Sequence, residues 1–140
     1  MTTARDIMHA GAKCVNEGES LQKAAQMMRD LNVGSLPICG NDDRLHGMIT
    51  DRDIVVKCCA EGKDLSQVKA GELAQGTPHW VDANADMKQV LNLMEQHQIR
   101  RLPVIADHRL VGMISEADLA RNLSDEQLAH FVENVYATSG

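Results

Sequence analysis

Apolar residues in the first half of the chain begin with a helical spacing. Four residues follow the i, i+3, i+4, i+7 pattern that is typical of an amphipathic helix, namely Leu21, Ala24, Ala25 and Met28. Ser20 precedes them and is a suitable N-cap, because its hydroxyl can accept from a free backbone N–H of the first turn. The pattern therefore predicts a helix that begins after Ser20.

The spacing then changes to short apolar runs typical of strands. Residues 35–39 and 45–50 are such runs, and the polar turn at 40–44 between them predicts an antiparallel pair. A shorter strand is expected at 13–15, before the helix, and a second helix is expected after Asp51. The first half thus predicts a β-α-β-β-α unit.

The second half of the chain repeats this order. A shift of 66 residues places Leu36-Pro37 on Leu102-Pro103, and a shift of 65 places Gly47 on Gly112. The lost residue falls in the turn between the two strands, where a deletion is tolerated. The repeat predicts a strand at 80–81, a helix after the N-cap Asp86, strands at 101–106 and 110–115, and a helix after Glu116.

We therefore expect an α/β fold of two β-α-β-β-α units packed about a pseudo-twofold axis. In each unit a right-handed crossover places the first strand parallel to the second. The expected boundaries are 1–62 for the first unit, 63–69 for the linker, 70–123 for the second unit and 124–140 for a C-terminal helix or tail. Ser124 and Gln127 form a capping-box pattern at the start of that helix. Docking onto its own unit and binding of a partner both remain open for it.

The most distinctive sequence feature is a turn that occurs twice, as GMITDRD at 47–53 and as GMISEAD at 112–118. Each copy carries a hydroxyl followed three residues later by a carboxylate: Thr50 with Asp53, and Ser115 with Asp118. Such a pair forms a helix cap without any ligand. The same geometry suits a nucleotide, because a hydroxyl can meet phosphate and a carboxylate can accept the hydroxyls of a ribose.

Composition and charge narrow the function. The net charge of −6 argues against nucleic acid and gives no support for an anionic membrane surface. No apolar run approaches the ~18 residues of a membrane span, and the N-terminus has no apolar core of a signal peptide. We expect a cytoplasmic protein, with secretion without a signal peptide as the alternative. No arrangement of nucleophile and base indicates an enzyme.

The doubled G-h-x-[S/T]-x-x-D turn, with its preceding Leu-Pro strand, resembles the CBS domain, which occurs in tandem pairs. The resemblance covers about residues 4–60 and 70–123, as in a free-standing pair. It implies a regulatory or stress-related protein, often a homodimer, that senses AMP, ADP or ATP and contacts an unknown protein partner. It also implies that Thr50 and Ser115 meet phosphate, and that Asp53 and Asp118 meet ribose.

The resemblance further implies basic and apolar contacts for each nucleotide. Arg100 and Arg101 would meet phosphate in the second copy; the first copy has Gly34 and Ser35 there, and Arg52 is the substitute. The adenine would lie near Val15, Pro37 and Ile38 in one copy and near Val81, Pro103 and Val104 in the other. Because only the second copy has the arginine pair, we expect Asp118→Ala to reduce affinity more than Asp53→Ala. The alternative is a CBS-fold interaction protein without nucleotide, in which Trp80 or methionines fill the cleft.

Cysteine and histidine suggest two further features. The predicted crossover makes Cys14 and Cys39 neighbours on adjacent strands, so a disulfide is possible, although buried free thiols are commoner in a cytosolic protein. Consecutive residues of a helix point about 100° apart, so one of Cys58 and Cys59 should be accessible. Six scattered histidines leave a zinc site open, with solvated histidines as the alternative: His9, His46, His79, His97, His108 and His130.

Overall fold

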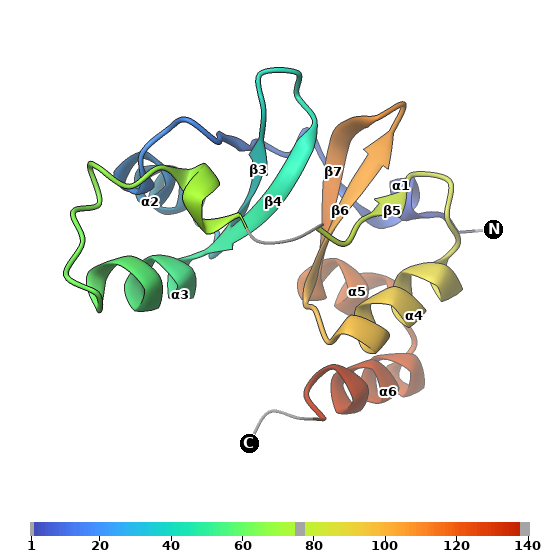
Figure 1. The fold of residues 1–140 in the computed structure, drawn as a ribbon. Coiled ribbons are helices and arrows are strands. Elements are labelled where there is room, and N and C mark those ends of the chain that lie inside the picture. The colour runs from blue at the N-terminus through green and yellow to red at the C-terminus, as the bar shows by residue number, and fades with distance from the viewer. Residues whose placement is uncertain (1, 75–77, 138–140) are drawn as a thin grey trace. The chain divides into compact units, whose positions relative to one another are not determined.

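The computed structural model describes residues 2–74 and 78–137, and it has the mixed α/β fold that the sequence predicts (Figure 1). The chain divides into two compact units. One consists of Met1–Ala12 together with His79–Gly140, and the other of Lys13–Pro78. Each unit has its own sheet and its own apolar core.

The unit Lys13–Pro78 contains a three-stranded sheet in the order β2 (Val15–Asn16), β3 (Ser35–Cys39), β4 (Leu45–Thr50). β2 is parallel to β3 and β4 is antiparallel to it, as the crossover and the turn predict. Its helices are α2 (Leu21–Leu31), α3 (Asp51–Ile54), the π-helical continuation η1 (Val55–Cys59), and the 3-10 helix η2 (Ala70–Leu73).

The other unit contains a four-stranded sheet in the order β1 (His9–Ala10), β7 (Arg109–Ser115), β6 (Arg101–Ala106), β5 (Val81–Asp82). β5 is parallel to β6, whereas β7 is antiparallel to both β6 and β1. Its helices are α1 (Ala4–Ile7), α4 (Met87–His97), α5 (Glu116–Asn122) and α6 (Asp125–Val135).

The compact units differ from the sequence repeats, because the segment that opens each repeat packs with the other one. Residues 1–12 belong with the second repeat: the Ala4 N–H donates to the Ala85 carbonyl at 2.8 Å. η2 belongs with the first repeat, where the Ala70 N–H donates to the Glu19 carbonyl at 2.8 Å. The segment 63–69, expected to be a linker, contributes Val68, which packs against that core.

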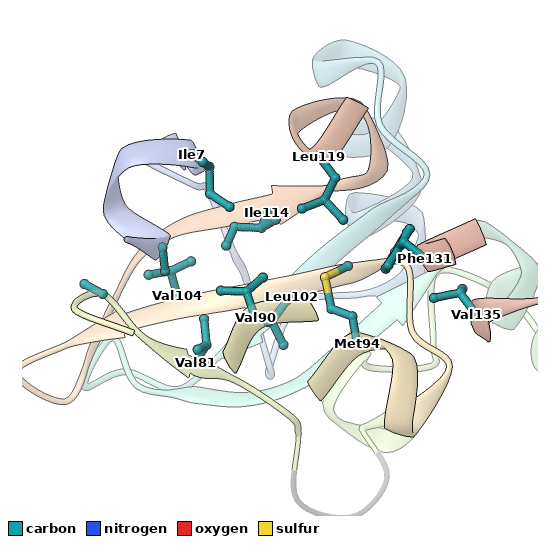
Figure 2. Packing of buried hydrophobic residues seen from close by; sticks show 12 residues of the cluster. Ile7, Val81, Val90, Met94, Leu102, Val104, Ile114, Leu119, Phe131 and Val135 are labelled. Atoms are coloured by element: carbon teal, nitrogen blue, oxygen red, sulfur yellow. The ribbon is translucent and has the colours of Figure 1, made fainter. Parts of the chain in front are cut away.

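The core of the second-repeat unit shows how the apolar pattern is used (Figure 2). Leu102 and Ile114 of the sheet pack with Met94 of α4 and Phe131 of α6. α6 therefore docks onto its own unit, with Phe131 fully buried, while Val132 on its other side stays 45% exposed. In the described residues, no helix has both the length and the apolar character needed to cross a membrane.

The predicted caps are confirmed. Ser20 accepts from the Lys23 N–H at 3.1 Å. Asp86 and Ser124 each form a capping box with the glutamine three residues later, Gln89 and Gln127. These side chains satisfy N–H groups that the first helical turn leaves without an intrahelical partner.

Candidate functional site

The two strand-to-helix turns share the same capping hydrogen bonds, in which one oxygen of each aspartate takes part. The Asp53 N–H donates to Thr50 Oγ1 at 3.0 Å, and Asp53 Oδ2 accepts from the Thr50 N–H at 3.0 Å. Asp118 repeats this reciprocal pair: its N–H donates to Ser115 Oγ at 3.4 Å and its Oδ2 accepts from the Ser115 N–H at 2.8 Å. The cap expected from the sequence is therefore present in both copies, and it uses one oxygen of each carboxylate.

The second carboxylate oxygen distinguishes the two copies. Asp53 Oδ1 lies 3.3 Å from Lys57 Nζ, and 25% of the Asp53 side chain is exposed. Asp118 Oδ1 accepts from Arg121 Nη2 at 2.6 Å and also lies 3.0 Å from His9 Nδ1. Only 2% of the Asp118 side chain is exposed. The Asp53 carboxylate is thus partly exposed, whereas the Asp118 carboxylate is enclosed.

The two adjacent arginines, Arg100 and Arg101, have different neighbours. Arg100 Nη1 donates to the Tyr136 hydroxyl at 3.2 Å, and its guanidinium carbon lies 5.5 Å from the centroid of that ring. The hydrogen bond to Tyr136 raises the pKa of Arg100, and Tyr136 in turn donates to Glu116 at 2.8 Å. Arg101 is exposed and stands opposite Ser115 in the β6–β7 register. Both arginines are exposed, but Arg100 is engaged by Tyr136, whereas Arg101 is the one opposite the turn residue Ser115.

Two cationic side chains lie close to the first turn. Arg52 is exposed and follows Thr50 by two residues on α3. Lys57 contacts Asp53 directly, and the sequence analysis did not single it out. Its position four residues after Asp53 on a helix is the signal that could have identified it. Arg121, three residues after Asp118, could have been identified in the same way.

The apolar residues expected near adenine lie mostly in the two cores. Val15 pairs with Ile38, Val81 pairs with Val104, and all four side chains are buried. Pro37 and Pro103 alternate with these core positions along their strands, so they lie on the opposite face of each sheet. Both prolines are themselves buried, so none of the six apolar residues of this set is exposed. Trp80 is 44% exposed and does not belong to the buried cluster.

Of the two states that the sequence left open for Cys14 and Cys39, the structure has the disulfide. The structure joins Cys14 and Cys39 as a disulfide, with their Cα atoms 5.8 Å apart. Cys39 lies on β3, and Cys14 immediately precedes the adjacent β2. Cys58 is buried and Cys59 is exposed, as expected for consecutive residues of a helix.

Metal ligands are not gathered in the described part of the chain. Residues 2–74 and 78–137 contain no group of three or more His, Cys, Asp or Glu side chains that could hold a metal ion. His46 Nδ1 instead lies 2.7 Å from Glu17, and His130 Nδ1 lies 3.2 Å from Glu95. The His79 and His97 rings stack on each other with centroids 3.7 Å apart. The described residues therefore do not form a built zinc site.

Comparison with known proteins connects these turns to a family. The CBS domain model matches residues 4–58 and 70–125. The chain is 57% identical over 135 residues to hypoxic response protein 1 of Mycobacterium tuberculosis, covering 96% of this chain and 94% of that protein. It is 36% identical over 140 residues to the CBS domain-containing protein YhcV of Bacillus subtilis, covering 96% of each.

A solved structure agrees with the sequence comparison. The crystal structure of hypoxic response protein I with two coordinated zinc ions superposes with a TM-score of 0.82 at 60% identity. It covers 88% of this chain and 100% of that one. With two matched repeats and two sheets of the expected topology, the chain belongs to the CBS domain family as a tandem CBS-pair protein related to hypoxic response protein 1.

Proposed function

We propose that the protein is a non-enzymatic regulator of a stress response that binds an adenine nucleotide at the Thr50–Asp53 turn. The observation that carries the proposal is the partial exposure of Asp53. Its Oδ2 atom is used by the cap, but 25% of the side chain is exposed and, among the described residues, Oδ1 contacts Lys57 at 3.3 Å. A carboxylate in this state can accept ribose hydroxyls.

The residues around Asp53 supply the remaining chemistry. Thr50 offers a hydroxyl at the end of β4, while Arg52 and Lys57 bring two positive charges to within a few residues of it. Cationic side chains favour phosphate through charge-assisted hydrogen bonds. Pro37 alternates with the core residue Ile38 along β3, but its own side chain is buried. The turn therefore combines groups suited to phosphate and ribose.

Calorimetric titration with AMP, ADP and ATP tests this function. We expect binding by the wild-type protein and a loss of about tenfold or more in affinity for Asp53→Ala, as for a lost charged hydrogen bond of about 1.4 kcal/mol or more. Gln67→Ala, a change at an exposed position of the same unit, is the control. No heat and no thermal shift with any of the three nucleotides would sink the proposal.

We also propose that the protein is a homodimer. Four large apolar residues of the Lys13–Pro78 unit are exposed at the end of α2 and on η1: Leu31, Val33, Val55 and Val56. Exposed apolar patches mark interaction sites, and the proposal takes these four residues as one patch. In analytical ultracentrifugation Val55→Glu should shift the protein toward monomer. Val132→Glu, at a similarly exposed valine of α6, should leave the association unchanged.

The second candidate function is an interaction protein, cytoplasmic or secreted, that takes no adenine nucleotide. The Cys14–Cys39 disulfide favours it, because such bonds persist mainly in oxidising compartments. The enclosure of Asp118 favours it as well, since that turn offers a ribose no free oxygen. Detection of the protein in culture filtrate, together with silent nucleotide titrations, would select this candidate.

The proposal includes no resident metal. Zinc is present in the crystal structure of hypoxic response protein I, but the described residues of this chain form no three-ligand group. Elemental analysis of protein purified without chelator tests this. Stoichiometric zinc would identify a site that uses ligands from outside the described residues or from a second chain.

A further inference from the structure

We propose that His9 is a gatekeeping residue that closes the Ser115–Asp118 turn to nucleotide, so that its removal opens a second site in each chain. The inference rests on the proposed function at the Thr50–Asp53 turn for its ligand class. It concerns the other copy, in which His9 contacts the carboxylate of Asp118.

The two carboxylates share two contacts. Each uses Oδ2 for its cap, and each places Oδ1 beside a basic residue of the following helical turn, Lys57 for Asp53 and Arg121 for Asp118. His9 Nδ1, 3.0 Å from Asp118 Oδ1, has no described equivalent at Asp53. In the duplication His9 corresponds to Gln75, which lies outside the described residues.

The position of His9 is fixed by main-chain pairing. β1 adds antiparallel to β7, with His9 opposite Met113 and Ala10 opposite Gly112. The Gly11 N–H continues the pairing to the Val111 carbonyl at 3.1 Å. Strand β1 thus holds the His9 imidazole near the end of β7. There it contacts Asp118 Oδ1, the oxygen that a ribose hydroxyl would use.

Gly112 allows this close approach. A Cβ atom at Gly112 would lie 2.6 Å from the His9 carbonyl oxygen and 2.5 Å from Met8 Sδ, both too close for any other residue. α1 anchors the same segment, because Ala4 is fully buried and Ile7 is 4% exposed in the core. The N-terminal segment is therefore seated against β7 along its length, and His9 is the part of it that reaches Asp118.

The His9 side chain is well placed for substitution. It is 62% exposed, so a smaller side chain leaves no cavity in the core, whereas Asp118 loses the contact that distinguishes it from Asp53. With His9 removed, the Asp118 carboxylate keeps its cap and Arg121, and Arg101 stands opposite Ser115. The opened turn would then contain a hydroxyl, a carboxylate and two arginines.

The test is calorimetric titration of AMP, ADP and ATP into the full-length wild type, His9→Ala and Arg5→Ala. Arg5 is an exposed residue of α1, so its change removes a positive charge from the same segment without touching Asp118. We expect His9→Ala to bind one more nucleotide per chain than the wild type and Arg5→Ala to match the wild type. Adding Ser115→Ala to His9→Ala should remove the extra nucleotide. His9→Ser is the substitute if His9→Ala does not fold.

The outcomes separate this inference from the proposed function. Unchanged stoichiometry in folded His9→Ala, or wild-type binding that depends on Asp118 rather than Asp53, overturns the role of His9. If the wild type binds nothing while His9→Ala binds one nucleotide in a Ser115-dependent way, His9 is the gatekeeper and the proposal for Asp53 fails. If neither protein binds, both proposals fall.

Discussion

At the scale of single residues, Asp53 and Asp118 occupy duplicated positions but have opposite environments. The sequence favoured the second copy as the stronger nucleotide site, because only that copy has two adjacent arginines. In the structure Arg100 is held by Tyr136, and Asp118 is enclosed by His9 and Arg121. These contacts lead us to reverse the predicted order of the two aspartates.

We predict that Asp53→Ala weakens nucleotide binding and that Asp118→Ala chiefly weakens the fold. Asp118 accepts from Ser115 and Arg121 while 2% exposed, so its loss should lower the free energy of unfolding by about 2 kcal/mol. Urea denaturation of both variants checks the prediction. A larger stability loss for Asp53→Ala than for Asp118→Ala would contradict it.

The short helix α1 should weaken in acid through Asp6. Hydrogen bonds from the Thr3 N–H and hydroxyl lower the pKa of Asp6 below its ordinary value of 3.8. A carboxylate whose pKa is depressed by folding contributes stability that is present above the unfolded-state pKa and is lost as the pH falls through the folded-state pKa.

Asp6→Asn should therefore be less stable than the wild type near neutral pH, and the difference should shrink below about pH 3.8. Thermal unfolding followed by circular dichroism at several pH values measures it. Asp107→Asn, in the turn between β6 and β7, is the control. A stability difference that stays constant down to about pH 2 would show that Asp6 does not act through its charge.

At the scale of elements, the apolar period predicted α2, α4 and the four longer strands with few errors. Their bounds follow from local signals: Ser20, Asp86 and Ser124 cap helices, and a polar turn separates each antiparallel pair. The short β1 and α1 were not predicted. They are too brief to show a period, and β1 forms only because the distant strand β7 accepts it.

Local sequence patterns also explain which site residues could be predicted and which could not. Thr50 and Asp53 stand within one helical turn of each other, as do Ser115 and Asp118, so spacing is enough to identify each pair. His9 is brought to Asp118 by strand pairing between opposite ends of the chain, and no local pattern records that contact. Tertiary partners of this kind decide whether a motif is accessible.

Helix α6 should owe its stability to its buried face rather than to its cap alone. Phe131→Ala should lower the free energy of unfolding by about 3–5 kcal/mol, because the ring is fully buried against Met94 and Leu102. Ser124→Ala should cost about 1 kcal/mol through loss of the cap. Val132→Ala, at an exposed position of the same helix, should change stability by less than about 0.5 kcal/mol when measured by urea denaturation.

The disulfide between Cys14, just before β2, and Cys39 of β3 can be tested by counting free thiols. With Cys14 and Cys39 joined, alkylation of the denatured, non-reduced protein should add mass at Cys58 and Cys59 alone. In the native protein Cys59 should react first, because burial shields Cys58 and raises the pKa of its thiol. Intact mass spectrometry gives both results, and four alkylated thiols would exclude the disulfide.

At the scale of the whole molecule, each compact unit is completed by a segment from the other repeat. Residues 1–12 close the sheet and core formed by the second repeat, while η2 packs with the first. The duplication is evident in the sequence, because the two repeats are similar. The packing of each opening segment with the other repeat is not, because sequence similarity does not show which segments are in contact. The predicted boundaries 1–62 and 70–123 therefore delimit repeats and stay a prediction as independent domains.

A fragment spanning residues 79–140 should be destabilised without the N-terminal segment, because its core lacks Ala4 and Ile7. A synthetic peptide of residues 1–12 should raise its melting temperature in a concentration-dependent way, since the peptide binds the folded form. Circular dichroism melts provide the measurement, with an Ile7→Asp peptide as control. Equal melting curves with and without the wild-type peptide would mean that the segment adds no stability.

The exchange of N-terminal segments also bears on how such a protein can be inherited and rearranged. A gene fusion or deletion cut at the sequence repeat would separate α1 and β1 from the strands that they complete. We therefore expect a rearrangement that moves the whole pair to preserve both cores, whereas one that moves a single repeat would separate a core from the N-terminal segment that completes it.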